Sequence, residues 1–143
     1  MDRNQKLHIL TTQGKYELRI DLEDVENKRY AKYNSFYIGN NSSYYKLIVS
    51  GYKGNAGNAM EIHNGSAFST KDSNHDGAKN SNCAADFKGA WWYNTCHHAN
   101  LNGAYLKGEH YDSSSYAAGV DWLQWRGYQY SLKTTSMMMR KLS

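Results

Sequence analysis

Apolar and charged side chains alternate without interruption over residues 15–22, KYELRIDL. In a strand this alternation puts the apolar residues on one face and the charged residues on the other, so it predicts a half-buried antiparallel strand. Two further apolar runs, over 30–38 and 44–52, are separated by turn-forming residues. The three runs predict a β-meander. Three apolar residues ahead of it are expected to extend the meander at its start: Leu7, Ile9 and Leu10.

The pattern changes at Gly65. Residues 56–61 favour a short helix, but beyond Gly65 hydrophobic periodicity is lost and Gly, Asn, Ser, Asp and His become frequent. Long loops in compact domains are usually functional or disordered, and the tryptophans here favour an ordered region. A β-like composition returns over 128–142 and predicts a last strand. We therefore expect a single domain, 1–143, with a sheet-forming part over 1–65 and a loop-rich part with a return strand over 66–143.

Composition narrows the class of protein. The 143 residues are 40% hydrophobic and 21% charged, which fits one globular domain and argues against a disordered chain. No run of 18 apolar residues occurs, which excludes a membrane-spanning helix. The formal net charge is +4, and the lysines are spread singly, which argues against nucleic acid as a partner. With 13 Tyr, four Trp and three Phe, rings that carry polar groups must fill much of the core.

The two cysteines, Cys83 and Cys96, leave three interpretations open. A disulfide between them would stabilise the fold by about 3 kcal/mol through loop closure. They could instead be two buried thiols. A zinc site would recruit His97 and His98, but adjacent histidines point in different directions and the spacing matches no common zinc motif.

The compartment is indicated by three glycosylation tripeptides and by the start of the chain. Residues 1–6 lack the apolar run of a signal peptide, so we expect either a cytosolic chain or a fragment of a secreted protein. The Asn-x-Ser tripeptides, together with the cysteine pair, favour an oxidising, extracellular setting. These tripeptides begin at Asn40, Asn41 and Asn64.

A candidate cation site precedes the first cysteine. Asp72, Asn74 and Asp76 occupy alternate positions and are followed by Gly77, as in the opening of a calcium loop. The match to an EF-hand ends there, because its twelfth position, which requires a bidentate Glu, is Cys83. A cation site of another kind and a polar turn capped by its own Asn and Asp side chains both stay open.

The segment 87–105, FKGAWWYNTCHHANLNGAY, concentrates aromatic residues around the second cysteine. Trp91 and Trp92 are expected in the core. A loop of Asn, Gly and His beside tyrosines has the composition of a small polar pocket of the kind that binds sugars. The chain contains no G-x-S-x-G, phosphate-binding loop or H-E-x-x-H, so we expect no enzyme.

Successive blocks of the chain resemble the fibrinogen-related domain, and within it the ficolins and tachylectins. These blocks, which cover nearly the whole chain in the correct order, are YELRIDLED, YAKYNSFYIG, IHNGSAFSTKD, NCAADFKGAWWYNTCHHANLNGAYLKG and YSLKTTSMMMRK. The resemblance implies an α+β, fibrinogen C-terminal-like fold, with an antiparallel sheet and short helices followed by a loop-rich calcium- and ligand-binding part. Relatives carry a further amino-terminal third that includes another disulfide and a strand of the central sheet. The resemblance therefore implies a partial domain whose sheet lacks a neighbour.

The resemblance also implies a Cys83–Cys96 disulfide and calcium as a cofactor. Relatives ligate calcium with two acidic side chains two residues apart and with nearby carbonyls. The implied ligands are Asn74, Asp76, Ala78 and Asn80, with Ser81 as an alternative carbonyl donor. An asparagine replaces the first aspartate, and the loop is one residue longer than in ficolins. Sites of this extracellular type have dissociation constants of about 10⁻⁴ to 10⁻³ M, and losing a carboxylate should weaken binding further.

In lectin members an acetyl group enters a funnel of aromatic rings. The matching residues are Phe87, Cys96, His97, Tyr116, Ala117 and Tyr128. The rings and Ala117 would receive the methyl group, and the backbone N–H of His97 would donate to the carbonyl oxygen. A cis peptide, which would be Thr95–Cys96, aims this donor in relatives. Two departures would reshape the rim: residues 111–115, YDSSS, form a longer segment than in ficolins, and Ala118 replaces a commonly polar residue.

The function implied is a secreted, calcium-dependent lectin of the innate-immunity type, without catalysis. It would recognise acetylated sugars such as N-acetylglucosamine on microbial or cell-surface glycans. Because single sites of this kind are weak, a homo-oligomer is expected to supply avidity, with no membrane insertion. The carboxy-terminal strand resembles the angiopoietins instead, so the alternative is a receptor-binding or adhesive protein-ligand domain of angiopoietin or fibrinogen type that binds no sugar.

Overall fold

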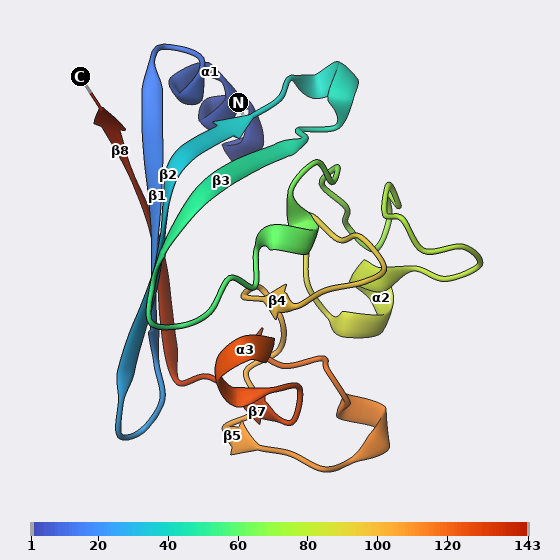
Figure 1. The fold of residues 1–143 in the computed structure, drawn as a ribbon. Helices are drawn as coiled ribbons and strands as arrows, with labels where there is room; N and C mark the ends of the chain where they lie inside the picture. The colour runs from blue at the N-terminus through green and yellow to red at the C-terminus, as the bar shows by residue number, and fades with distance from the viewer. Residues whose placement is uncertain (1, 143) are drawn as a thin grey trace.

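A four-stranded antiparallel sheet forms one side of the molecule, and loops with short helices cover one of its faces (Figure 1). This computed structural model describes residues 2–142. The sheet has the order β3-β2-β1-β8, which places the last strand beside the first. Its strands are β1 (Lys15–Glu23), β2 (Lys28–Ile38), β3 (Leu47–Gly54) and β8 (Thr134–Leu142). None of the helices within 2–142 is long and apolar enough to cross a membrane.

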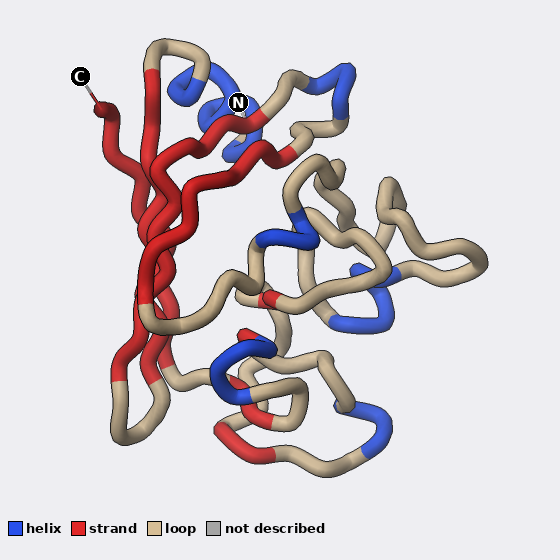
Figure 2. The backbone as a smooth tube through the Cα atoms, in the orientation of Figure 1, coloured by secondary structure: helices blue, strands red, loops and turns tan. Residues whose placement is uncertain are grey.

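The loop-rich half contains only short elements, and loops make up most of it (Figure 2). Two pairs of two-residue strands tie it together, β4 with β6 and β5 with β7. The short strands are β4 (Ala99–Asn100), β5 (Gly108–Glu109), β6 (Asp121–Trp122) and β7 (Tyr130–Ser131). The helices of this half are α2 (Cys83–Phe87) and α3 (Leu123–Arg126), with a 3-10 turn at Ser113–Ser115. Two further 3-10 turns, Asn41–Ser43 and Glu61–His63, lie in the sheet-forming part.

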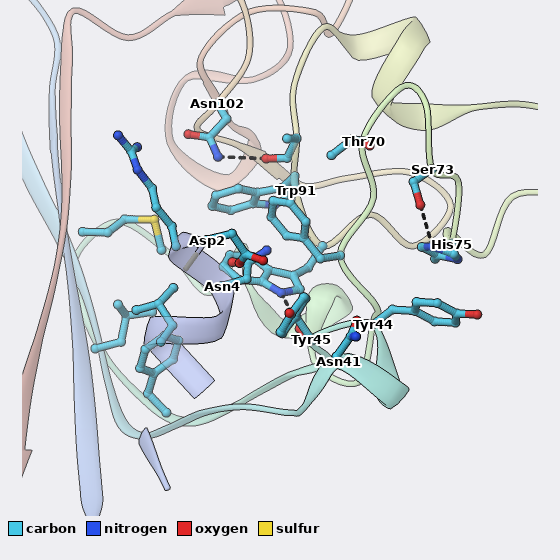
Figure 3. Close-up of a pocket in the computed structure, with 18 of the residues that line it drawn as sticks. Asp2, Asn4, Asn41, Tyr44, Tyr45, Thr70, Ser73, His75, Trp91 and Asn102 are labelled. Carbon is cyan, nitrogen blue, oxygen red and sulfur yellow. Dashed lines mark hydrogen bonds between the residues drawn. The ribbon is translucent and has the colours of Figure 1, made fainter. Parts of the chain in front are cut away.

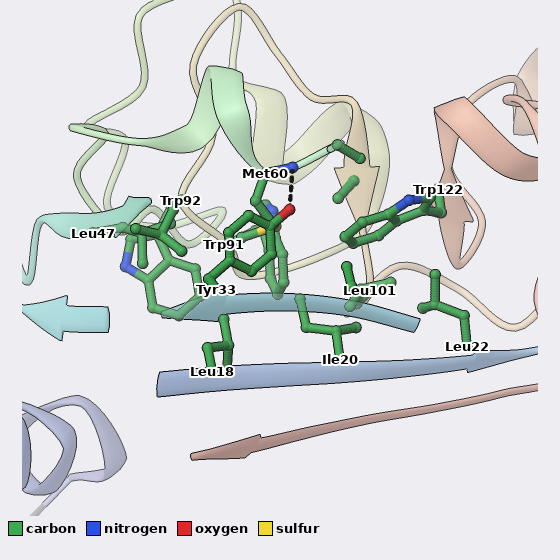
Figure 4. Close-up of a cluster of buried hydrophobic side chains, with 14 of the residues drawn as sticks. Leu18, Ile20, Leu22, Tyr33, Leu47, Met60, Trp91, Trp92, Leu101 and Trp122 are labelled. Atoms are coloured by element: carbon green, nitrogen blue, oxygen red, sulfur yellow. Dashed lines mark hydrogen bonds between the residues drawn. The ribbon is translucent and has the colours of Figure 1, made fainter. Parts of the chain in front are cut away.

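The core lies between the sheet and the loops, on the face that the alternating pattern predicts. Leu18, Ile20 and Leu22 are at most 2% exposed and point from β1 toward the tryptophans of the loop region (Figure 4). Trp91 and Trp122 are fully buried, and Trp92 is 4% exposed. The prediction of a half-buried β1 and of a core position for Trp91 and Trp92 is therefore confirmed. Burying large aromatic rings against a short sheet is a major source of stability.

The amino-terminal residues form a helix, so the predicted extension of the meander by Leu7, Ile9 and Leu10 is wrong. Helix α1 spans Arg3–Thr11, and the Asp2 carboxylate caps it by accepting the N–H of Gln5 at 2.9 Å. The Thr11 hydroxyl accepts the N–H of Ile38 at 3.1 Å, which joins α1 to the end of β2. Leu7 and Leu10 follow helical spacing, which the short segment did not distinguish from a strand.

The helix expected over 56–61 is also wrong. Residues 59–60 form a turn, and a 3-10 turn over Glu61–His63 follows. The indole N–H of Trp122 donates to the carbonyls of Ala56 and Gly57, both at 3.1 Å, so these groups are used in a tertiary contact. Gly57 has φ of +90°, which a helix does not allow.

Two predicted strands have different ends in the structure. The run expected over 44–52 begins at Leu47, because Tyr44 and Tyr45 both adopt left-handed backbone with φ of 56°. The strand expected over 128–142 is divided into β7 and β8. The break lies where the chain passes from the loops back to the sheet: the N–H of Leu132 donates to the Val120 carbonyl, and that of Lys133 donates to Glu23, both at 2.9 Å.

Candidate functional site

His97 lies at the centre of a cluster of aromatic rings from three segments of the chain. Its ring centroid is 5.0 Å from that of Phe87 and 5.3 Å from that of Tyr128, both edge to face. Tyr128 in turn packs edge to face on Tyr116 at 5.7 Å. Phe87 ends α2, whereas Tyr116 and Tyr128 flank the segment that contains β6 and α3. The structure thus brings together four residues that the sequence resemblance assigns to one pocket.

Hydrogen bonds fix Ala117 and His97 within this cluster. The Nε2 of His97 lies 2.8 Å from the Ala117 carbonyl, which can only accept, so Nε2 carries the proton. The hydroxyl of Tyr128 donates to the His97 carbonyl at 2.7 Å, and the Ala117 N–H donates to the Tyr128 carbonyl at 3.3 Å. Ala117 is 4% exposed and has φ of 58°. Its small side chain therefore has a defined place at the base of the rings.

The imidazole of His97 is neutral at physiological pH. Burial lowers its pKa to about 4, partly offset by the hydrogen bond to Ala117. The peptide bond Thr95–Cys96 is cis, as the resemblance implies. Within residues 2–142 the backbone N–H of His97 makes no hydrogen bond. A backbone donor without a partner beside apolar rings is suited to a carbonyl oxygen from a ligand.

The Cys83–Cys96 disulfide is present, which excludes the free-thiol and zinc interpretations. The two Cα atoms are 5.6 Å apart, and the bond spans 13 residues of sequence. Cys83 begins α2, and Cys96 directly precedes His97. The bond therefore connects the helix that carries Phe87 to the segment that carries the His97 donor.

The calcium ligands expected at Asn74, Asp76, Ala78 and Asn80 lie in one loop, but their polar groups are engaged with each other. The Asp76 carboxylate accepts the N–H of Ala78 and of Cys83, both at 2.9 Å. The Asn74 amide donates from Nδ2 to the Ser81 carbonyl at 3.0 Å.

Within residues 2–142 no group of three or more His, Cys, Asp or Glu side chains gathers around a cation position. Calcium prefers six to eight oxygen ligands, whereas here one of the expected ligands presents an N–H. In this arrangement the donor set does not fit the ion, and calcium binding stays a prediction.

The three predicted glycosylation acceptors lie on the surface. The side chain of Asn40 caps the 3-10 turn Asn41–Ser43, and the Oδ1 of Asn64 accepts the N–H of Val49 at 2.9 Å. Their exposure is compatible with modification in a secretory compartment.

Comparison with known proteins identifies the fold. Residues 3–142 match the family described as the C-terminal globular domain of fibrinogen beta and gamma chains. The chain belongs to this family. It is 49% identical over 142 residues to the proteins named Fibrinogen C domain-containing protein 1 of Xenopus tropicalis and of human. Each match covers 95% of this chain. Because the match spans 30% of these relatives, it compares with only part of each.

Solved fibrinogen-like structures superpose closely on this fibrinogen C-terminal domain. The globe domain of human ANGPTL6 gives a TM-score of 0.92 at 38% identity, and that of human ANGPTL2 gives 0.91 at 45%. These matches cover 98% and 96% of the chain and 63% of each solved chain. Lamprey fibrin D-dimer, complexed with the peptide Gly-His-Arg-Pro-amide, gives 0.89 at 36% and covers 98% of this chain and 51% of that one. The predicted α+β fibrinogen-like fold is confirmed.

A large groove of this fibrinogen C-terminal domain lies away from the ring cluster and was not expected from the sequence. Its volume is about 730 Å³, and its walls come from the buried face of the sheet and from Trp91 and Trp92 (Figure 3). Tyr44 stacks on His75 at 3.7 Å between ring centroids at its mouth. None of the residues predicted for the acetyl pocket lines it. Its lining combines apolar residues with polar ones such as Asn4, Thr70 and Asn102, from segments far apart in the sequence, so no local pattern predicts it.

A buried carboxyl group of the fibrinogen C-terminal domain also escaped prediction. Asp121 in β6 is fully buried, and neither carboxylate oxygen has a hydrogen-bond partner within residues 2–142. Desolvation raises its pKa to about 8. The same carboxyl contributes to the raised pKa values of Tyr93 and Tyr128, so it lies near the ring cluster. The sequence did not indicate this burial, because an aspartate between two apolar residues, Val120 and Trp122, is typical of the exposed face of a strand.

Proposed function

We propose that this chain is an extracellular lectin domain that binds the acetyl group of N-acetylated sugars and has no catalytic activity. The observation that carries the proposal is the unpaired His97 N–H beside the Phe87, Tyr116 and Tyr128 rings. The rings and Ala117 would contact the acetyl methyl group, and the N–H would donate to the acetyl oxygen. The natural targets would be microbial or cell-surface glycans, and a homo-oligomer would raise avidity.

The electrostatics of the cluster support a neutral ligand group. His97 is uncharged because its pKa lies near 4, and its Nε2 proton is used by Ala117. Phe87 adds no charge. A carboxylate ligand would find no cationic side chain within the cluster to offset its desolvation, whereas an amide carbonyl needs only the single N–H donor.

The test is retention of the disulfide-intact chain on N-acetylglucosamine beads, with glucosamine beads as the matched control without the acetyl group. We expect retention only on the acetylated beads, with elution by free N-acetylglucosamine and not by free glucosamine. Each arm is run with calcium chloride and with chelator. Equal retention on both bead types, or none by a chain that circular dichroism shows to be folded, would overturn the proposal.

Replacing Tyr116 with alanine is expected to weaken retention about 3- to 10-fold without changing the thermal midpoint. Tyr116 is 52% exposed, so its ring contributes little to the core but forms one wall of the pocket. An aromatic contact of this kind is worth about 0.5–1.5 kcal/mol. Tyr105→Ala is the matched control, because Tyr105 is 57% exposed and lies outside the cluster. An equal loss of retention in the two variants would contradict the assignment of Tyr116 to the pocket.

The second candidate is a protein- or peptide-binding domain. It is favoured by the close superposition on the ANGPTL globe domains and on a lamprey fibrin that is complexed with a peptide. In that case the rings around His97 serve only as packing. Two results together would support this candidate over the lectin. The wild-type chain would not bind acetylated beads, and the Tyr116→Ala variant would still bind a protein ligand.

A further inference from the structure

The loop before α2 is closed by side-chain hydrogen bonds of its own. This loop, residues 72–82, projects from the right side of the molecule in Figure 1. The Oδ1 of Asn74 accepts the N–H of Asp76 at 3.1 Å, while its Nδ2 donates across the loop to the carbonyl of Ser81 at 3.0 Å. The Asp76 carboxylate then accepts the N–H groups of Ala78 and Cys83, each at 2.9 Å.

Only an amide at position 74 can make both of these bonds. An asparagine side chain accepts through its oxygen and donates through its nitrogen, whereas an ionised aspartate only accepts. With aspartate at 74, a carboxylate oxygen would face the Ser81 carbonyl, and two acceptors would lie where one hydrogen bond now exists. A cation between them would restore attraction. The side-chain Nδ2–H of Asn74 thus supplies the partial positive charge that a metal ion would otherwise provide.

The loop closed in this way supports the segment that leads to His97. The N–H of Gly77 donates to the Asn94 carbonyl at 3.0 Å. A Cβ at Gly77 would come within 2.5 Å of the Asn94 Oδ1, so any larger residue at position 77 would require the Asn94 side chain to move. Asn94 precedes the cis Thr95–Cys96 bond and the His97 donor. A displacement of the loop would therefore reach the ring cluster through Asn94.

We infer that Asn74 is a positioning residue whose side-chain amide replaces a divalent cation in this loop, so that the domain folds and holds the His97 segment without calcium. The corollary is that Asn74→Asp converts the loop into one that needs calcium. This inference does not depend on sugar binding, because it concerns the stability of the loop itself.

The experiment measures thermal unfolding of the full chain in EGTA and across a calcium chloride titration. For the wild-type chain we expect a midpoint that changes by less than about 1 °C between EGTA and 10 mM calcium. Asn74→Asp is expected to lower the midpoint by about 3 °C in EGTA, in proportion to the loss of one hydrogen bond. Calcium should restore it, with half of the effect at about 10⁻⁴ to 10⁻³ M.

Asn74→Ala is the matched control. It removes the same donor without adding a carboxylate, so its midpoint should fall by a similar amount and should not respond to calcium. A general loosening of the loop would affect both variants alike and could not produce a calcium response in one alone. If Asn74→Asp folds poorly in EGTA, the titration begins from the calcium-bound state and follows the loss of folded protein on chelation.

Two results would overturn the inference. One is a wild-type midpoint that rises with calcium as much as that of Asn74→Asp, which would place an ion in the natural loop. The other is an Asn74→Asp chain as stable as wild type in EGTA, which would show that the amide does not hold the loop. Because the readout is unfolding, failure of the lectin proposal leaves this test unaffected.

Discussion

Asp121→Asn is expected to raise the thermal midpoint at pH 8.5 by about 5 °C or more and to leave it almost unchanged at pH 5. The folded-state pKa of this buried carboxyl is raised by desolvation to about 8 from an ordinary value of 3.8. Each unit of such a difference corresponds to about 1.4 kcal/mol. At alkaline pH the native state must hold either an unpaired buried charge or an extra proton, whereas an amide needs neither. The buried amide has its own desolvation cost, which offsets the gain at low pH.

The sign of the pH dependence follows from proton uptake. Asp121 has a higher pKa in the folded state, so its contribution to stability is complete below pH 3.8 and is lost as the pH rises toward 8. His63 and His97 behave in the opposite way: burial lowers both pKa values to about 4 from 6.5. Their contribution is complete above pH 6.5 and is lost as the pH falls toward 4. The wild-type chain should therefore be most stable near pH 6.5.

Thermal scans between pH 5 and 9 test this account. Asp121→Asn should abolish the decline above pH 6.5 while keeping the acid-side decline due to the histidines. Asp72→Asn is the control, because it makes the same chemical change at an exposed position. If Asp121→Asn lowered the midpoint at every pH, the carboxylate would have a favourable partner in the folded state, and the assignment of an unpaired buried acid would be wrong.

The sheet was predictable because its signal is local. Strict alternation over residues 15–22 specifies which face is buried, and the observed burial of β1 follows it except at Glu17, which is buried on the charged face. The elements that were mispredicted depend on distant partners. The segment over 56–61 is not a helix because Trp122, more than sixty residues away, binds its carbonyls. Helix α1 was missed because a nine-residue segment with few apolar residues carries almost no periodic signal.

The candidate site was predictable mainly through the family resemblance. From the residues alone, Asn, Gly and His beside tyrosines indicate only a polar pocket of unspecified position. Nothing local joins Phe87 to Tyr128, which come together because both pack on His97. The resemblance supplied that contact, but it could not supply the hydrogen bond from Asn74 to Ser81, since it implies an acid at that position. The hydrogen bond between Asn74 and Ser81 and the burial of Asp121 became visible only in three dimensions.

Removing the disulfide with the double variant Cys83→Ala, Cys96→Ala is expected to lower the free energy of unfolding by about 3 kcal/mol. The bond closes a loop of 13 residues, and its loss lets the unfolded chain gain conformational entropy. Alanine fits the fully buried position of Cys83 without adding a polar group. Urea unfolding of the oxidised wild type, the reduced wild type and the double variant measures the effect. Nearly equal values for all three would mean that the loop is already ordered in the unfolded chain.

The same variant separates stability from positioning of the proposed binding site. His97 follows Cys96 directly, so the disulfide sets the position of the backbone donor relative to the rings. At low temperature, where the double variant is still folded, retention on N-acetylglucosamine beads should fall at least about tenfold, which corresponds to about 1.4 kcal/mol. If retention per folded molecule equalled that of the wild type, the Tyr128 and Ala117 hydrogen bonds would suffice to hold His97. The disulfide would then stabilise the fold without shaping the pocket.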